Sequence, residues 1–364
     1  MKTPDIVSLR LHNQRLAEPG FTTPAEVVSW LGAVQSQDYT GAKWALGMRT
    51  PSITDADVDR AFAAGAVLRT HVMRPTWHFV APEDIRWLLA LTAPRVHAAS
   101  AYQYRKLELD DSIFARSNYL FAEALQGGKQ LTRQELATVL HRAGIATLSA
   151  DSLLRITYIV MHAELDAVLC SGAKQGKQFT YALLDERAPQ ARNLPRTEAL
   201  AELTRQYFTS HGPALLKDFT WWSGLTTADA RAGIDIIGSE LISEIVDGQT
   251  YWLSPSTQAT PVEDKNSMAY LLPNYDEYMI GYTDRDAILA PGHARKLELL
   301  FPHWVVVDGQ VVGSWKRTIS KQGTEVSARL FTSMSDAQES ALDEAATRYS
   351  RFLGTPVTLQ KSKF

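Results

Sequence analysis

The chain has 364 residues and a formal net charge of −3 at pH 7, with 45% hydrophobic and 21% charged residues. This composition is typical of a globular protein with two or three domains. No run approaches the roughly 18 apolar residues of a membrane span, and the first residues lack a signal-peptide core, so we expect neither. The charge balance excludes a strongly basic protein, so any contact with DNA must use a local patch.

One cysteine, Cys170, excludes an internal disulfide and a metal site built from several cysteines. Its apolar neighbours, Ala167 to Leu169, predict a buried structural thiol rather than a nucleophile. A reducing cytoplasm is the compartment that fits this cysteine usage best.

The first strong helix signal covers residues 23–34. Thr23 suits the N-cap, Pro24 suits the first helical position, and Glu26 completes a capping box. Apolar residues then recur at helical spacing, which predicts one buried stripe along the helix.

Two glutamines, Gln35 and Gln37, follow this helix directly. We expect the chain to leave the helix at about Gln35 and become extended, so that residues two apart point to the same side. Both amides would then converge on one point, which is an arrangement for holding a water molecule or the edge of a base. The alternative is a helix C terminus whose free carbonyls bond the two amides, and the residues alone favour it.

The rest of the first region alternates helices with a hairpin. A helix begins after a cap at Thr54, and strands are predicted over 67–73 and 76–80. Helix, helix and short hairpin is the order of a winged helix-turn-helix. Arg74 and Trp77 lie on the proposed wing, although Trp77 taken alone is better explained as a core aromatic residue beside a surface arginine.

The same pattern recurs twice along the chain. A second capping box opens a helix, another helix follows over about 151–165, and two short strands flank a basic turn over 172–177 with Lys174 and Lys177. A further pair of helices and a third hairpin come next. We interpret these segments as three divergent copies of one unit, with domains over 1–110, 111–190 and 191–260.

The C-terminal part, residues 261–364, has a different pattern. Asp308-Gly309 between two apolar strands is the strongest hairpin signal in the chain, because this pair suits a type I′ turn. A closing helix from the Ser335 capping box to about Leu353 then predicts a small sheet covered by helices.

Trp315, Lys316 and Arg317 form a basic and aromatic edge on this C-terminal hairpin. Such an edge suits phosphate contacts and a wedge against a base step. Surface charge exposed to solvent is an equally favoured alternative.

Two other pairs of residues are candidate sites. His71 and His78 suggest a metal pair, but no third and fourth ligand has a recognisable spacing, so we expect no metal. Asp276 and Glu277 suggest an acid/base pair, but adjacent side chains usually diverge, so a structural hydrogen-bonded corner is favoured. The sequence has no phosphate-binding glycine loop and no dinucleotide fingerprint, and we expect no cofactor.

Taken together, the motifs resemble the winged-helix DNA glycosylases of the AlkZ/YcaQ type, bacterial enzymes that remove alkylated purines, bulky adducts and interstrand crosslinks. The matching segments occur in the family's order and span nearly the whole chain: residues 31–38, 74–80, 215–225, 272–278 and 306–317.

This resemblance implies that Gln35 and Gln37 are catalytic, because Gln-x-Gln is the signature of the AlkZ branch. The middle residue is often aliphatic in the family, and Ser36 departs from that. The implied fold is α+β and C-shaped, with three tandem winged helix-turn-helix units and a C-terminal β-rich domain. Its concave face would bind duplex DNA, and the expected contacts are Arg74, Trp77, Lys174, Lys177, Trp315, Lys316 and Arg317.

The implied activity is hydrolysis of the N-glycosidic bond of N7-alkylguanine or N3-alkyladenine in DNA. No lysine adjoins the motif, so we expect a monofunctional enzyme that leaves an abasic site. We also expect a nucleoid-associated cytoplasmic monomer that binds no membrane. The alternative is a non-enzymatic winged-helix DNA-binding or regulatory protein, because a fold does not fix a function.

Overall fold

The computed structural model describes residues 2–146, 152–257, 267–283, 285–289, 302–320 and 323–363. Within these residues the protein has mixed α and β structure, as expected, and no helix is long and apolar enough to cross a membrane. The expected domain boundary at 260/261 and the expected helix start at Asp151 lie outside the described residues.

One order of elements occurs three times: a helix, a short strand, two helices and a hairpin. The N-terminal unit consists of α2 (Pro24–Leu31), β1 (Val34–Gln35), α3 (Tyr39–Arg49), α4 (Asp55–Ala64), β2 (Leu68–His71) and β3 (Trp77–Val80). The middle unit consists of α6 (Asp111–Leu125), β4 (Leu131–Thr132), α7 (Arg133–Arg142), α8 (Leu153–Leu165), β5 (Leu169–Ser171) and β6 (Thr180–Leu183). The third unit consists of α10 (Arg196–Ser210), β7 (Ala214–Leu215), α11 (Leu216–Ser223), α12 (Thr227–Ile237), β8 (Ile242–Val246) and β9 (Gln249–Leu253). In each unit the first strand pairs with the third, which gives the sheet orders β1-β3-β2, β4-β6-β5 and β7-β9-β8.

The remaining elements connect these units or form the C-terminal part. The connecting elements are α1 (Thr3–Asn13), α5 (Ile85–Lys106), α9 (Leu184–Arg187) and the single turns η2 (Gly238–Glu240) and η3 (Pro255–Thr257). The C-terminal part consists of β10 (Ala269–Leu272), α13 (Glu277–Ile280), β11 (His303–Val307), β12 (Gln310–Ser320), β13 (Gly323–Leu330), α14 (Asp336–Leu353) and β14 (Val357–Lys363). Its strands form one sheet in chain order, antiparallel except for the parallel pair β13–β14.

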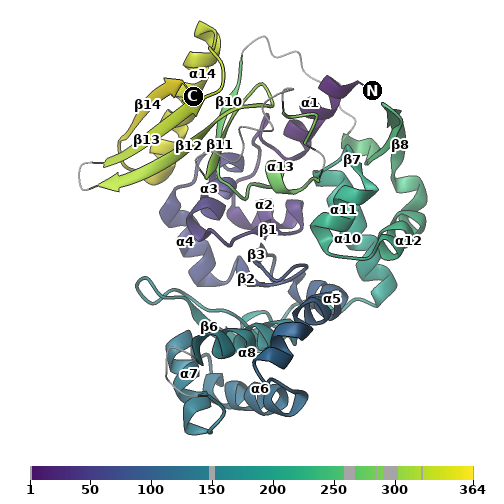
Figure 1. The fold of residues 1–364 in the computed structure, drawn as a ribbon, viewed down its shortest axis with the longest axis vertical. Helices are drawn as coiled ribbons and strands as arrows, with labels where there is room; N and C mark the ends of the chain where they lie inside the picture. The colour runs from purple at the N-terminus through teal and green to yellow at the C-terminus, as the bar shows by residue number, and fades with distance from the viewer. Residues whose placement is uncertain are drawn as a thin grey trace.

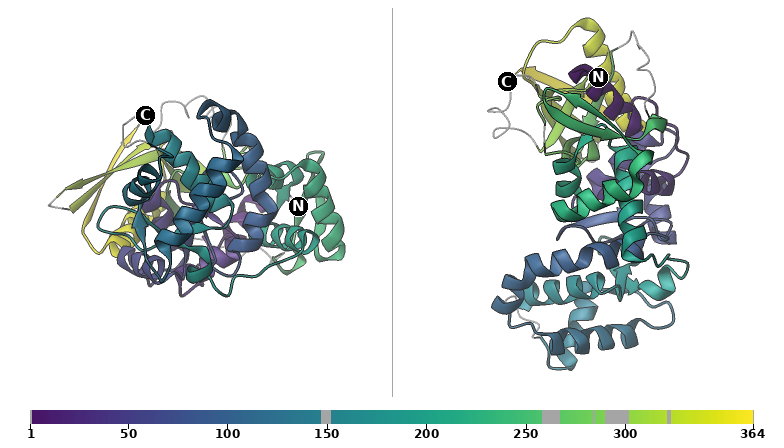
Figure 2. Two further views of the ribbon diagram at one scale, coloured as in Figure 1. Left: turned by 90° about the horizontal axis from the view of Figure 1, so that it is seen from below. Right: turned by 90° about the vertical axis from the view of Figure 1, so that its right-hand side faces the viewer.

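The molecule is elongated, and the middle unit forms one end of it (Figure 1). The N-terminal unit lies near the centre, between the middle unit and the C-terminal sheet, with the third unit beside it. Seen from the side, α5 lies along the junction between the middle unit and the rest of the molecule (Figure 2).

Two large hydrophobic cores are shared between units. One joins the N-terminal unit to the C-terminal sheet, where Trp44 of α3 packs against Tyr349 and Phe352 of α14 with ring centroids 4.8 and 5.2 Å apart. The other joins the middle and third units to α5, and Cys170 is fully buried in it, as predicted. Each large side chain buried in this way contributes about 1.5–3 kcal/mol, so the shared cores fix the units relative to one another.

The three units differ where the first strand meets the following helix. In the middle and third units the helix begins at the residue directly after Thr132 and after Leu215, the last residues of β4 and β7. In the N-terminal unit three residues, Ser36, Gln37 and Asp38, separate β1 from α3. The second glutamine therefore lies in a segment that the other two units lack, which we call the extra segment.

The predicted element boundaries hold in several places and shift in others, as in the strand predicted over 67–73, which is β2 (Leu68–His71). Helix α2 ends at Leu31 rather than residue 34, because Gly32 adopts a φ of 77° and stops the helix. The C-terminal hairpin turn is confirmed, with φ values of 50° at Asp308 and 77° at Gly309. The capping box at Ser335 and the end of the closing helix at Leu353 are also confirmed.

Candidate active site

Strand β1 and helix α3 hold the extra segment at its two ends. Gln35 pairs with His78 of β3 in the sheet. Asp38 caps α3 by accepting a hydrogen bond from the Gly41 N–H at 3.1 Å. The segment therefore forms a short bridge between a sheet and a helix N terminus, and rigid elements of this kind limit its freedom to move.

Both glutamine amides contact the connection between β2 and β3. Gln35 Oε1 accepts a hydrogen bond from Arg74 Nη2 at 3.4 Å, and Gln37 Oε1 accepts one from the backbone N–H of Trp77 at 3.5 Å. Gln35 is buried and Gln37 is exposed. In the described residues neither amide bonds a carbonyl of α2, so the helix-cap alternative is not what the structure shows. Both contacts lie at the long end of the hydrogen-bond range.

Arg69 of β2 fixes the middle of the segment. Its Nε and Nη2 donate to the Ser36 carbonyl at 3.2 and 3.1 Å, and the Ser36 N–H donates to the Trp77 carbonyl at 2.8 Å. The guanidinium lies between the rings of Trp77 and Phe179, 4.4 and 4.5 Å from their centroids. Burial lowers the pKa of Arg69 to about 10, so it stays charged at neutral pH. Sequence reasoning missed both Arg69 and Phe179, because only the fold brings them to the segment.

A buried carboxylate, Glu277 at the start of α13, anchors the backbone of Gln35. One of its oxygens accepts from the Gln35 N–H at 3.1 Å. The other accepts from Trp222 Nε1 at 2.8 Å and lies 3.4 Å from His211 Nε2. Burial raises the pKa of Glu277, but His211, the Gln35 N–H and Arg74 together lower it more, so the net pKa lies below its ordinary value. Glu277 therefore ties Gln35, as a charged group, to both the third unit and the C-terminal part.

The neighbouring carboxylate, Asp276, has a different partner. Its two oxygens accept from Arg49 Nη1 and Nη2 at 2.9 and 3.0 Å, and both side chains are fully buried. Asp276 and Glu277 thus diverge into separate contacts, as the interpretation of a structural corner expected. An acid/base pair formed by these two residues is not what the geometry shows.

The third unit contributes to the surroundings of Arg74. The Arg74 guanidinium lies 5.7 Å from the ring centroid of Trp221, a half-exposed residue of α11. Burial lowers the pKa of Arg74, while Glu277 raises it. Gly224, just after α11, packs so closely that a Cβ there would lie 2.2 Å from the Met73 carbonyl oxygen. The end of α11 is therefore in direct contact with the connection that carries Arg74.

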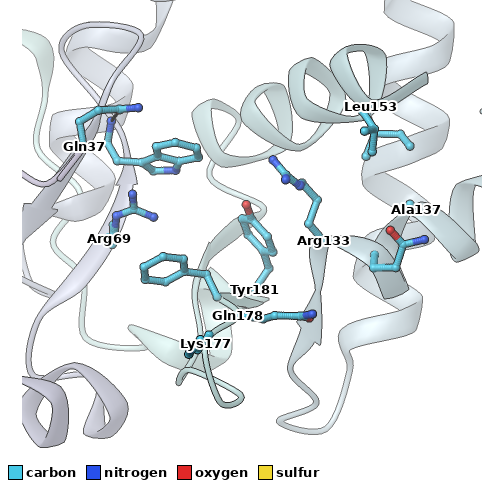
Figure 3. A pocket seen from close by; sticks show the side chains of 12 residues that line it. Gln37, Arg69, Arg133, Ala137, Leu153, Lys177, Gln178 and Tyr181 are labelled. Carbon is cyan, nitrogen blue, oxygen red and sulfur yellow. Dashed lines mark hydrogen bonds between the residues drawn. The ribbon is translucent and has the colours of Figure 1, made fainter. Parts of the chain in front are cut away.

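A cavity of about 510 Å³ opens beside Gln37, between the N-terminal and middle units (Figure 3). Gln37 and Arg69 lie on one side of it, with Arg133, Gln178 and Tyr181 facing them. Its lining combines aromatic rings, cationic groups and amides: Gln37, Arg69, Trp77, Arg133, Gln134, Ala137, Leu153, Ile156, Lys177, Gln178, Phe179 and Tyr181. Such walls suit a flat, polar ligand or an unstacked base, because rings stack on it and cations attract phosphates.

The two lysines of the middle hairpin lie in different surroundings. Lys177 lines the cavity. Lys174 instead lies 3.8 Å from Asp59 and 4.9 Å from the ring centroid of Tyr39, so it packs against the N-terminal unit. Lys174 therefore draws the hairpin toward the N-terminal unit.

The expectation that Trp315 forms an exposed wedge is wrong. Trp315 is 1% exposed, and its indole N–H donates to the Leu272 carbonyl at 2.9 Å. Alternate residues of a strand point to opposite faces, so Trp315 and Arg317 turn toward α14 while Lys316 points outward. Arg317 accordingly donates to the Tyr349 hydroxyl at 2.7 Å. Lys316 is the exposed residue of the three.

Comparisons with known proteins agree over most of the chain. The family described as DNA glycosylase AlkZ-like matches residues 28–352. A relative from Streptomyces sahachiroi, described as an interstrand DNA cross-link repair glycosylase, is 26% identical over 332 residues, which are 85% of this chain and 86% of that protein. The solved structure of the Streptomyces sahachiroi DNA glycosylase AlkZ matches with a TM-score of 0.81 at 23% identity and covers 99% of this chain and 100% of that one.

Proposed function

This chain belongs to the AlkZ-like DNA glycosylase family, and we propose that it hydrolyses the N-glycosidic bond of alkylated purines in DNA. Gln35 and Gln37 are the proposed catalytic residues. The observation that carries this proposal is that both amide oxygens lie against one connection, Arg74 to Trp77, and that Gln37 lines a large cavity.

The chemistry of the leaving group explains why two neutral amides suffice. Alkylation at N7 of guanine or N3 of adenine gives the base a positive charge, so the base leaves as a neutral molecule without added protonation. The protein then needs to place a water molecule near C1′ and to stabilise a cation-like sugar, and oriented carbonyl oxygens do both. Glutamine takes no proton, so the water releases its proton to solvent. Water is the nucleophile and an abasic site is the product.

Arg69 and Glu277 act as positioning residues in this proposal. Arg69 holds the Ser36 carbonyl, and Glu277 holds the Gln35 N–H. Together they fix the backbone on both sides of the first amide. Preorganised dipoles of this kind cost no reorganisation when positive charge develops on the sugar.

The cavity supports a substrate range that includes adducts larger than a methyl group. The cavity has a volume of about 510 Å³ and lies directly beside Gln37. Its aromatic walls are Trp77, Phe179 and Tyr181. A bulky group attached to the purine would occupy this space while the sugar approaches the amides. Repair of interstrand crosslinks, the activity in the description of the relative, is the extreme case of such a substrate.

The three repeated units are the proposed DNA-binding scaffold. We assign each one as a winged helix-turn-helix, over 1–110, 111–190 and 191–260, with residues 261–364 as a C-terminal β-rich domain. The strand order shared by all three sheets supports this assignment. The proposed contacts of this monomer with DNA are Arg74, Trp77, Lys177 and Lys316.

Base release from defined lesions tests the proposal. The purified chain is incubated with duplex DNA carrying N7-methylguanine or a crosslink between two N7-alkylguanines, and free base and abasic sites are measured by mass spectrometry. Release is expected to fall about a hundredfold or more in Gln35→Ala and in Gln37→Ala. Gln126→Ala, an exposed glutamine of the middle unit, is the matched control and should release base at the wild-type rate.

Two outcomes would contradict the proposal. Full activity in the Gln35→Ala/Gln37→Ala double variant would remove the two glutamines from catalysis. Tight binding of undamaged duplex with no base release from either substrate would support a non-enzymatic DNA-binding protein instead.

A further inference from the structure

Three side chains of types that ligate metals meet where the connecting helix α5 packs against α8 of the middle unit. His97 comes from α5, His162 from α8, and Asp166 from the residue that ends α8. Their ligand atoms all lie within 4.8 Å of one another. We call these three residues the α5–α8 cluster, and neither the glutamine site nor the proposed DNA contacts use it.

The distances within the cluster match the spacing of ligands around a small divalent ion. His97 Nε2 lies 3.5 Å from Asp166 Oδ1, and His162 Nδ1 lies 3.0 Å from Asp166 Oδ2. Tetrahedral Zn²⁺ with bonds of about 2.0–2.1 Å separates its ligand atoms by about 3.3 Å. The spacing of four residues places His162 and Asp166 on the same face of α8, which points both toward His97.

Neighbouring groups orient two of the three ligands. The Tyr104 hydroxyl lies 3.1 Å from His97 Nδ1, which leaves Nε2 of the same ring facing Asp166. Asn118 Nδ2 donates to Asp166 Oδ2 at 2.7 Å. Protein metal sites use hydrogen bonds of this kind to fix the ligand ring and carboxylate before the ion arrives.

The third candidate ligand atom is Nδ1 of His162. His162 Nδ1 is buried and lies 3.0 Å from Asp166 Oδ2, in an ion-pair contact whose angle falls outside hydrogen-bond geometry. Phe114 stacks on the His162 ring, with centroids 3.5 Å apart and planes 14° apart, and holds the ring in place. A metal ion held between this nitrogen and the Asp166 carboxylate would give both atoms well-directed bonds.

We propose that His97, His162 and Asp166 bind one divalent transition-metal ion of the Zn²⁺ class. Two imidazoles and one carboxylate suit Zn²⁺, Co²⁺ or Ni²⁺, and water occupies the fourth position. The side chains are 26%, 15% and 34% exposed, so the ion has a path from solvent. The bound ion links α5 to α8 and stabilises the base of the middle unit, independently of base release.

Cobalt provides the direct test, because tetrahedral Co²⁺ has a visible absorption band. The full chain, prepared without a histidine tag and stripped with a chelator, is titrated with Co²⁺ and then with Zn²⁺. One equivalent of Co²⁺ should produce the band, Zn²⁺ should displace it, and Zn²⁺ should raise the melting temperature. His162→Ala and Asp166→Asn should each weaken binding about tenfold or more.

Two further variants keep the test decisive. His12→Ala removes an imidazole that is 26% exposed, as His97 is, and should bind Co²⁺ as the wild type does. Tyr104→Phe removes only the hydroxyl that orients His97, and should weaken binding about tenfold. This variant keeps the test usable if His162→Ala fails to fold. The proposal is overturned if the wild type shows no saturable binding, or if Asp166→Asn and Tyr104→Phe bind the ion as tightly as the wild type.

Discussion

The N-terminal and middle units share an order of elements but differ in how the first strand is joined to the next helix. In the middle unit the junction is held locally, because Thr132 and Glu135 form a capping box within four residues. In the N-terminal unit the junction contains the extra segment, and distant groups hold it: Arg69 from β2 and Glu277 from the C-terminal part. Local contacts thus hold the helix start in the middle unit, while long-range contacts hold the proposed catalytic residues.

The largest expected effects come from substitutions at the two buried carboxylates, Asp276 and Glu277, which should change different properties. Asp276→Asn breaks the buried pair with Arg49 and should lower the free energy of unfolding by about 3–5 kcal/mol, as measured by urea denaturation. The folded fraction should still release base at the wild-type rate, because Asp276 does not contact the extra segment. Glu277→Gln should lower base release about tenfold or more, because the Gln35 N–H loses its charged acceptor. Equal effects of the two substitutions on base release would show that Glu277 acts only through stability.

Acidic pH should destabilise the C-terminal sheet, against which the N-terminal unit packs. Burial, and next Arg317, lower the pKa of His303 from 6.5 to about 4. Below about pH 6.5 the unfolded chain binds a proton at His303 that the folded chain does not bind. The stability that neutral His303 contributes is therefore complete above pH 6.5 and is lost as the pH falls toward 4. The loss is roughly 3 kcal/mol, measurable as unfolding free energies between pH 7.5 and 4.5. His303→Gln should flatten the profile in that window, and an unchanged slope would contradict the assignment.

The smallest expected effects come from alanine substitutions at two equivalent helix caps. Asp38 caps α3 in the N-terminal unit, and Thr132 caps α7 in the middle unit. Alanine at either position should lower the free energy of unfolding by about 1 kcal/mol. Asp38→Ala should also slow base release, because Asp38 holds one end of the extra segment, whereas Thr132→Ala should not. If both variants keep full activity, the cap does not position the glutamines.

Sequence patterns predicted the local features of this molecule and missed the long-range ones. The capping boxes, the type I′ turn and the buried thiol follow from neighbouring residues, and so does the position of Gln35 and Gln37 after a helix. Trp315 was assigned to the wrong face, because a strand with both faces partly covered gives no clear alternation. Arg69 and Phe179 carry no local signal, and their role depends on packing between units.

The α5–α8 cluster is another long-range feature that local sequence patterns do not predict. His97 is separated from His162 by more than half of the middle unit, so no ligand spacing is visible in the sequence. No local motif predicts a metal at this place, whereas His71 and His78, the histidine pair that the sequence brings close together, do not form one within the described part of the chain. In the structure His71 lies 2.5 Å from Glu164 and stacks on Trp77, so it is part of the packing beside the cavity.

The contact between Gln35 and Glu277 has a consequence for the order of synthesis. These residues are 242 positions apart. At typical translation rates of 5–20 residues per second, roughly 12–50 s pass between them. During that time the N-terminal unit can form its helices and hairpin, but the extra segment lacks the carboxylate that anchors it. Under the proposed function, a nascent or truncated chain without the C-terminal part therefore holds its two glutamines unanchored, and base removal begins only when the C-terminal part has been made and has docked.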